Sequence, residues 1–120
     1  MAKIKQEITD ALLDEILRLI VETAQPQKVI LFGSRARGDA HPSSDLDILV
    51  VKESTEPRYR RSVPILLALS QIHVPMDILV YTPQEIEAWK AVPQAFVTTA
   101  IREGKVLYSR EDGVWFRNMR

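Results

Sequence analysis

The chain has 120 residues, of which 46% are hydrophobic and 27% charged, and its 16 basic residues balance 16 acidic ones. This length predicts one domain over residues 1–120 with a single core, and the lack of a basic excess argues against direct, sequence-blind nucleic-acid binding. The chain contains no cysteine, so it has no disulfide, zinc–thiolate site or thiol nucleophile. It also has no apolar run of ~20 residues and no signal core behind the first lysines, so we expect a cytoplasmic protein that does not enter membranes.

The first half of the chain predicts one helix and two strands. Apolar residues at helical spacing indicate an amphipathic helix over residues 8–25, which Pro26 ends. A short strand is expected over 28–32, followed by one helical turn over 34–38 and a polar loop. The second strand, 45–51, is apolar on both faces beyond its carboxylates, as in an interior strand. The connection is too short for a crossover helix, so the two strands are expected to be antiparallel.

A helix, a strand and another helix are expected next. One helix starts near Ser62 and reaches about residue 71, because Pro64 fits only the first turn of a helix. A third strand follows over 74–81. The segment Thr82-Pro83-Gln84-Glu85 combines an N-cap, a proline at the first helical position and a glutamate three residues after the cap. This combination predicts a helix start.

The end of the chain predicts one more helix and one more strand. Pro93 interrupts the helical region, and a second helix runs to about Glu103. Gly104 suits a left-handed C-terminal cap, and residues 105–108 form a last, edge strand. Helices that alternate with strands indicate an α/β fold with a mixed β-sheet flanked by helices.

The most informative motif connects the first two strands and reads Gly33-Ser34, ten residues, then Asp45-Leu46-Asp47. Alternation along a strand places both aspartates on one face, with Cα atoms roughly 6.5–7 Å apart. Carboxylates at this spacing can hold two metal ions about 3.5–4 Å apart. Gly33 lets the backbone approach a phosphate closely, and Ser34 offers a hydroxyl that can cap the following turn, whose N–H groups point at an anion. The alternative is a pair of solvated aspartates at a strand start.

A third carboxylate, Asp77, lies inside the apolar strand 74–81. Because a buried carboxylate is costly unless it is paired or binds metal, we expect Asp77 to join the site as a metal ligand and as the general base for an attacking hydroxyl. The alternative is a charge that protects an edge strand from aggregation. Arg35 and Arg37 flank the glycine–serine turn and either contact a triphosphate or form surface ion pairs.

Other polar residues carry weaker signals. Arg58, Arg60 and Arg61 form either a solvated helix face or a contact to substrate or partner. His41 and His73 have no partners at metal-ligand spacing, so both are expected to be loop or surface residues.

The tail over residues 110–120 is charged but carries Trp115 and Phe116. These two aromatic residues either fold back onto the core or dock on another protein.

The motif residues resemble the signature of the minimal nucleotidyltransferase (MNT) branch of the DNA polymerase β nucleotidyltransferase superfamily. That signature is Gly-Ser, ten residues, Asp-x-Asp, and a third carboxylate on a later strand. Each position is filled, by Gly33, Ser34, Asp45, Asp47 and Asp77. The segment 29–38 is also similar, and the closing segment 101–108 is similar but less specific, so the resemblance covers nearly the whole chain.

The resemblance implies a polymerase β-like nucleotidyltransferase fold that uses Mg²⁺, in a two-ion arrangement, and a nucleoside triphosphate, most often ATP. Ser34 would bind the phosphates with the residues around it, while Asp45 and Asp47 would hold metal and Asp77 would complete the site. Short members resemble the antitoxin half of HEPN–MNT toxin–antitoxin pairs. In those pairs the nucleotidyltransferase transfers AMP to a tyrosine of a HEPN ribonuclease toxin.

The acceptor is the open question for a chain of this length. A site with three carboxylates and metal can polarise the α-phosphate and activate a hydroxyl, but it does not select an acceptor. We therefore expect the acceptor on another chain, which predicts a protein AMP transferase that acts as an antitoxin on a bound HEPN toxin. Two alternatives stay open: a non-catalytic module that neutralises the toxin by occlusion, and a free-standing small-molecule nucleotidyltransferase.

Overall fold

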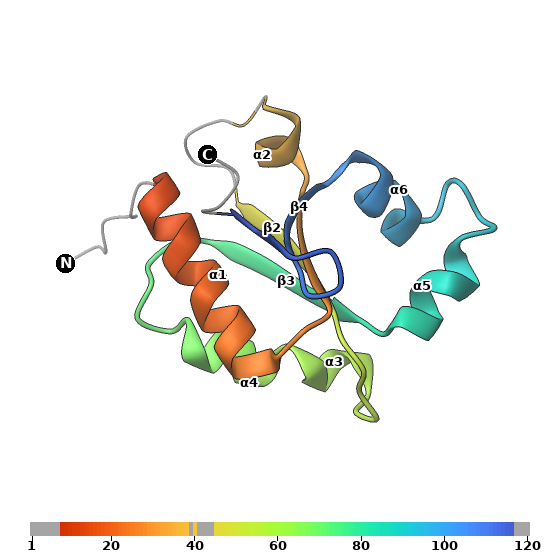
Figure 1. Ribbon diagram of the computed structural model, residues 1–120, viewed down its shortest axis with the longest axis horizontal. Coiled ribbons are helices and arrows are strands. Elements are labelled where there is room, and N and C mark those ends of the chain that lie inside the picture. The colour runs from red at the N-terminus through yellow and green to blue at the C-terminus, as the bar shows by residue number, and fades with distance from the viewer. Residues whose placement is uncertain (1–7, 39, 41–44, 117–120) are drawn as a thin grey trace.

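Helices and strands alternate along residues 8–38, 40 and 45–116, which are the residues that the computed structural model describes (Figure 1). In chain order the elements are α1 (Asp10–Ala24), β1 (Lys28–Phe32), α2 (Ser34–Arg37), β2 (Leu46–Val51), α3 (Arg58–Arg61), α4 (Val63–Ala68), β3 (Met76–Tyr81), α5 (Pro83–Trp89), α6 (Phe96–Glu103), β4 (Lys105–Ser109) and β5 (Val114–Trp115). The strands form one sheet in the order β3-β2-β1-β4-β5. β1 is antiparallel to β2 and β4, whereas β2 and β3 are parallel. The predicted mixed sheet and the antiparallel first pair are confirmed.

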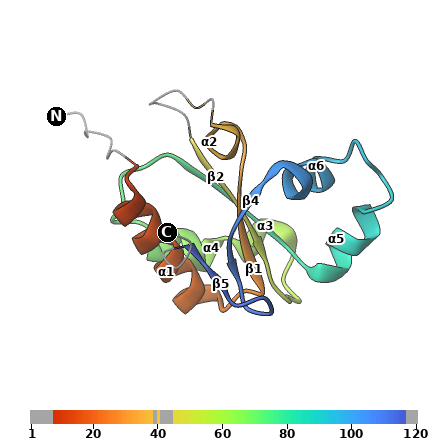
Figure 2. The same cartoon turned by 45° about the horizontal axis from the view of Figure 1, so that its top comes forward.

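Helices cover both faces of this sheet. α1 and α4 pack on one face, and α5 and α6 lie on the other (Figures 1 and 2). Each face has its own core, with Ile48 of β2 against α1 and Leu49 of β2 on the side of α6. β2 lies between β1 and β3 with five of its six residues buried, as predicted for an interior strand. None of the described helices is long and apolar enough to span a membrane.

Two of the predicted helices, α1 and α5, start at residues whose side chains make capping hydrogen bonds. The Thr9 hydroxyl accepts a hydrogen bond from the N–H of Leu12 at 3.1 Å, which starts α1. Thr82 and Glu85 form a complete capping box at α5, because each side chain accepts a bond from the other residue's N–H, at 3.1 and 2.9 Å. Pro64 lies in the first turn of α4.

Gly104 corrects one expectation. Its backbone is extended, with φ −80° and ψ 166°, and not left-handed. A Cβ at this position would lie 2.6 Å from Cγ2 of Ile30 and 2.9 Å from the carbonyl oxygen of Leu31. The glycine is therefore needed because the end of α6 approaches β1 closely, a reason that lies in tertiary packing.

The C-terminal aromatic residues fold back onto the domain, which settles the alternatives for the described part of the tail. Trp115 lies in β5, meets the ring of Tyr108 edge-to-face at 5.3 Å and donates a hydrogen bond from Nε1 to Oδ1 of Asp14 at 3.2 Å. Phe116 packs against the same core as α1. Because β5 pairs with β4, the prediction that β4 is an edge strand is wrong.

The basic cluster on α3 is mainly structural. The Arg61 side chain is only 9% exposed and donates to both carboxylate oxygens of Glu85, at 2.6 and 3.2 Å. It also donates to carbonyl oxygens at the end of β3 and in the loop before α3. Arg58 lies over the ring of Tyr81, 4.6 Å from its centroid. Arg61 therefore does not lie on a solvated helix face, and its contacts tie α3 to β3 and α5. Arg60 is exposed.

The structure tests the prediction for only one of the two histidines. His73 is exposed in the loop before β3, as expected for a surface residue. His41 lies outside the described residues.

Candidate active site

Three side chains form a row across one end of the sheet. Phe32 of β1 pairs with Asp47 of β2, and Asp47 pairs with Asp77 of β3. Residues that lie opposite each other in paired strands point to the same face, and neighbouring strands are about 4.8 Å apart. Phe32 belongs to the core on the side of α5 and α6, so both aspartates point to that face, at the end of the sheet where α2 begins.

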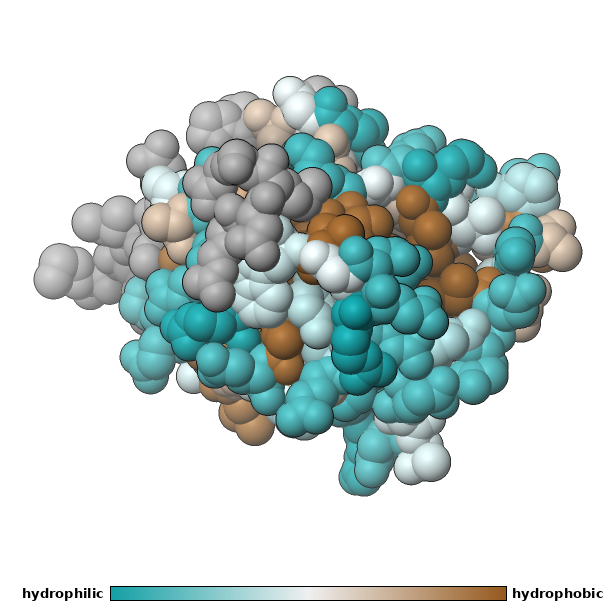
Figure 3. Space-filling view, in the orientation of Figure 1, coloured by the Kyte–Doolittle hydropathy of each residue, from teal (hydrophilic) through white to brown (hydrophobic). Residues whose placement is uncertain are grey.

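This row borders a pocket of about 310 Å³, at the lower end of the range for small-molecule sites. The lining residues are Phe32, Gly33, Arg37, Asp47 and Asp77 at the end of the sheet and in the following turn, and Phe96, Thr99, Ala100 and Glu103 on α6. The spacing of the α6 residues is that of one helix face. Hydrophobic surface gathers over α6 and towards α5 in Figure 3.

The contribution of α6 was not predicted from the sequence. Phe96, Thr99 and Glu103 have helical spacing, which is visible in the sequence. However, nothing local in the sequence indicates that this face of the helix borders Asp47. Glu103 adds a fourth carboxylate to the region, at the end of α6 that approaches β1.

Position 33 requires a glycine, because of its backbone conformation and because the Asp47 carboxylate lies beside it. Its φ is +75°, a conformation that glycine adopts at little cost. A Cβ at this position would collide with Oδ2 of Asp47. Gly33 also holds the N-cap position of α2, and Ser34 is the first helical residue, so the expected capping role of the Ser34 hydroxyl is wrong. The turn thus keeps the Asp47 carboxylate against the backbone that leads into α2.

Negative charge gathers around Asp47. Partial burial raises the pKa of the Asp47 carboxyl above its ordinary value, and the negative charges of Asp77 and Asp45 raise this pKa further. The positive charge of Arg37 acts in the opposite direction. A divalent cation would relieve this repulsion, and carboxylate oxygens are the ligands that Mg²⁺ prefers. The donor chemistry therefore fits the metal that the sequence motif implies.

The three aspartates are not equally placed. Asp47 and Asp77 line the pocket, whereas Asp45 is exposed just before β2 and is not among the lining residues. Within residues 8–38, 40 and 45–116, no three carboxylate or imidazole groups form a ready-made metal-binding cluster. The structure thus brings two of the predicted metal ligands to one pocket and leaves the third beside it, close enough for its charge to act on Asp47.

Asp77 reaches the pocket for a different reason from the one expected. β3 is the outer strand of the sheet and Asp77 is exposed, so the cost of burial does not apply to it. Its register opposite Asp47 is what places it at the site. Of the two predicted arginines, Arg37 lines the pocket and Arg35 is partly buried on α2 without lining it.

The sequence as a whole decides the family. Residues 14–113 match the model of the family described as polymerase beta, nucleotidyltransferase. The chain belongs to this nucleotidyltransferase family. The mixed sheet with helices on both faces is accordingly the polymerase β-like nucleotidyltransferase fold. No curated protein matches this nucleotidyltransferase in sequence.

Solved structures share the fold of this nucleotidyltransferase. A candidate nucleotidyltransferase from Sulfolobus solfataricus is 24% identical, with a TM-score of 0.62 over 88% of this chain and 84% of its own. A toxin–antitoxin structure with AMP-PNP is 23% identical, with a TM-score of 0.53 over 88% and 78% of the two chains. A mutant of the toxin–antitoxin MntA–HpeT is 19% identical, with a TM-score of 0.50 over the same shares.

Proposed function

We propose that this nucleotidyltransferase transfers AMP from ATP to a hydroxyl group of a bound partner protein and thereby acts as an antitoxin. The single observation that carries the proposal is the register of Asp47 opposite Asp77, beside the Gly33 turn and inside one pocket. The partner is a HEPN-type toxin, and the acceptor is a tyrosine of that toxin.

Different residues bind the triphosphate and the metal ion. Arg37 and the turn at Gly33 and Ser34 bind the triphosphate, which places the α-phosphate beside Asp47. Asp47 and Asp77, joined by Asp45, hold Mg²⁺. When bound, Mg²⁺ polarises the phosphoryl oxygens and neutralises the charge on the leaving group.

The transfer itself is an in-line displacement. The acceptor hydroxyl oxygen forms a bond to the α-phosphorus, the bond from that phosphorus to its bridging oxygen breaks, and pyrophosphate leaves with the electron pair. The hydroxyl proton passes to the Asp77 carboxylate. Because Asp77 is exposed on the outer strand β3, an acceptor on another protein has access to it.

The neighbouring structures support two parts of the proposal, which are the toxin partner and the role of the aspartate pair. Two of them are toxin–antitoxin proteins, one with the ATP analogue AMP-PNP. The MntA–HpeT structure is of a mutant in which two aspartates, one residue apart, are both replaced by glutamate. Asp45 and Asp47 have this same spacing.

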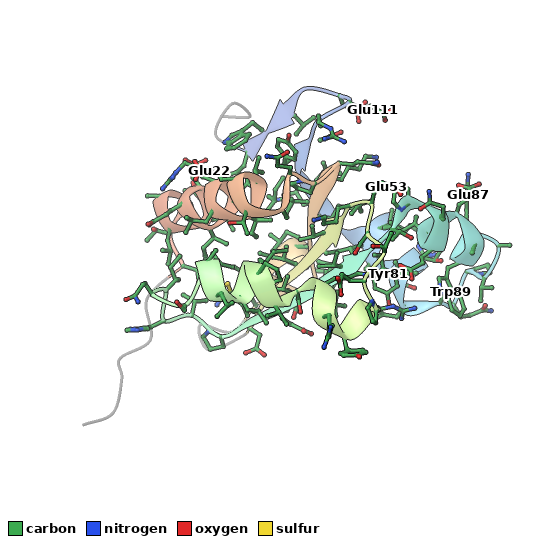
Figure 4. The ribbon with its side chains drawn as sticks, turned by 90° about the horizontal axis from the view of Figure 1, so that it is seen from below. Glu22, Glu53, Tyr81, Glu87, Trp89 and Glu111 are labelled. Atoms are coloured by element: carbon green, nitrogen blue, oxygen red, sulfur yellow. The ribbon has the colours of Figure 1, made fainter. Side chains whose placement is uncertain are left out.

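The test is labelling of the partner. ATP labelled at the α-phosphate is incubated with Mg²⁺, this protein and the product of the neighbouring gene, and we expect the label on that product. A double variant, Asp45→Asn with Asp47→Asn, should lose at least 100-fold in labelling. A control, Glu111→Gln, changes an exposed carboxylate on the turn after β4 (Figure 4) and should label like the wild type.

Other outcomes of this experiment would favour one of the alternative functions. Equal labelling by the double variant would contradict the carboxylate mechanism. A double variant that does not label but still neutralises the toxin would identify a binding module that acts by occlusion. Modification of an aminoglycoside without any partner would identify a small-molecule nucleotidyltransferase.

A further inference from the structure

Phe96 is the largest side chain on the α6 wall of the pocket. It is 53% exposed, and its ring meets the ring of Phe32 edge-to-face, with centroids 5.4 Å apart and an interplanar angle of 84°. Phe32 is buried and belongs to the same row as Asp47. The Phe96 ring is therefore supported by a fixed neighbour while about half of its surface is open to solvent.

The position of Phe96 distinguishes it from other exposed apolar residues. A single exposed phenylalanine is ordinary on a protein surface. Phe96, however, lines the same pocket as Gly33, Arg37 and Asp47. Because Phe32 and Asp47 are one strand spacing apart, Phe96 lies on the order of 10 Å from the carboxylate row. This distance is within the reach of one ribose between an α-phosphate and a base.

The neighbours of Phe96 on the α6 wall leave room for a flat ligand. Thr99 is small and partly exposed, and Ala100 is buried, so neither projects a large side chain into the pocket beside the phenyl ring. Stacking on an aromatic ring contributes to the binding of every base, because each base has a π-face, and modest preferences between bases come from differences in stacking strength.

We propose that Phe96 is the stacking platform for the base of the bound nucleotide, and that it gives the site a preference for purines over pyrimidines. The inference rests on the proposed nucleotidyl transfer and adds to it a base-binding residue. Adenine and guanine present larger stacking surfaces than cytosine and uracil, so ATP and GTP bind more tightly than CTP and UTP. Adenine and guanine themselves are distinguished little by this contact.

The competing occupant is a partner protein. Trp89 and Val92 are also exposed, and Trp89, Tyr81 and Phe96 line a second pocket of about 250 Å³. Figure 4 shows Tyr81 and Trp89 near α5. Trp89 does not line the pocket that contains Asp47. It is therefore a matched control, an exposed aromatic residue next to Phe96 but outside the proposed base site.

The experiment measures dissociation constants by calorimetry with Mg²⁺ and the non-transferable α,β-methylene analogues of ATP, GTP, CTP and UTP, together with inorganic tripolyphosphate. We expect Phe96→Ala to weaken binding of the ATP and GTP analogues about 5- to 150-fold and to leave tripolyphosphate unchanged. Phe96→Trp should keep binding within about threefold of the wild type. Trp89→Ala should bind all five ligands like the wild type.

Three results would contradict the proposed stacking role of Phe96. The first is unchanged affinity of Phe96→Ala for the ATP analogue. The second is an equal loss for tripolyphosphate, which would indicate a structural role. The third is loss of toxin binding by both Phe96→Ala and Trp89→Ala at unchanged nucleotide affinity, which would assign the surface to the partner.

Failure of the stacking proposal can be distinguished from failure of the proposed function. If Phe96→Ala binds ATP normally while the aspartate variants lose labelling, the platform fails and the transferase stands. If nucleotides bind with the expected dependence on Phe96 but no toxin is labelled by the wild type, the proposed function fails.

Discussion

Gly33 and Asp47 leave no room between them for a side chain, because a Cβ at position 33 would collide with Oδ2 of Asp47. The glycine of the motif was expected to serve the approach of a phosphate to the backbone. In the structure it also makes space for a carboxylate of the site. The turn at the end of β1 and the start of β2 are thus coupled through direct packing.

Replacement of this glycine tests the coupling. Gly33→Ala should lower the labelling rate about 100-fold, since a displacement of about 1 Å in a catalytic group has an effect of this size. Its backbone strain alone should cost about 1 kcal/mol of folding free energy. Gly113→Ala is the matched control, because Gly113 has a similar φ of +68° and nothing within 4 Å of an added Cβ. A Gly33→Ala enzyme with wild-type activity would contradict the coupling.

The raised pKa of Asp47 predicts a pH-dependent cost to the fold. In the folded chain, burial and the negative charges of Asp77 and Asp45 disfavour the charged form of Asp47, and this penalty is absent from the unfolded chain. Asp47→Asn removes this penalty and should raise the Tm at pH 7. The penalty of the wild type declines as the pH falls through the raised pKa, and it is absent below the unfolded value of about 3.9.

Melting curves of both proteins between pH 3.5 and 8, without divalent cations, check this prediction. The gain in Tm should shrink as the pH is lowered. An Asp47→Asn protein that is less stable than the wild type at pH 7 would contradict the prediction, because it would show that the Asp47 carboxylate stabilises the folded chain.

Arg61 should affect stability rather than chemistry. Arg61→Ala removes the bidentate contact with Glu85 and should cost roughly 2–3 kcal/mol of the free energy of unfolding. The Arg61 hydrogen bond, with burial opposing it, lowers the pKa of Glu85. The stabilisation is therefore present above the ordinary pKa of a glutamate and is lost as the pH falls through the lowered value.

Urea denaturation at pH 7 measures the effect. Arg60→Ala, on the same turn but exposed, should change the free energy of unfolding by less than about 0.5 kcal/mol. Equal effects of the two substitutions, or a loss of nucleotide affinity in folded Arg61→Ala, would contradict the structural role of Arg61.

Much of the fold was predictable because its signals are local. Pro64, the Thr82–Glu85 capping box and the apolar pattern of β2 each act within a few residues, and each lies where the sequence indicated. The short connection between β1 and β2 was likewise sufficient to predict an antiparallel pair.

The remaining features depend on contacts between distant segments. Arg61 looks like a solvated arginine until β3 and the capping glutamate of α5 are placed beside it. Gly104 is explained by its approach to β1, and Phe96 by the packing of α6 beside the carboxylate row. The aspartates of the motif were identifiable by spacing, but the exposure of Asp77 follows from the strand order, which local patterns do not specify.

The most direct test of the central claim is the position of a divalent cation at the row of aspartates. Crystals grown with Mn²⁺ and the α,β-methylene analogue of ATP allow the ion to be located by its anomalous scattering. We predict a peak bridged by the carboxylates of Asp47 and Asp77, with metal–oxygen distances of about 2.0–2.3 Å and the α-phosphate beside it. A bound nucleotide whose metal lies away from both carboxylates would contradict the account.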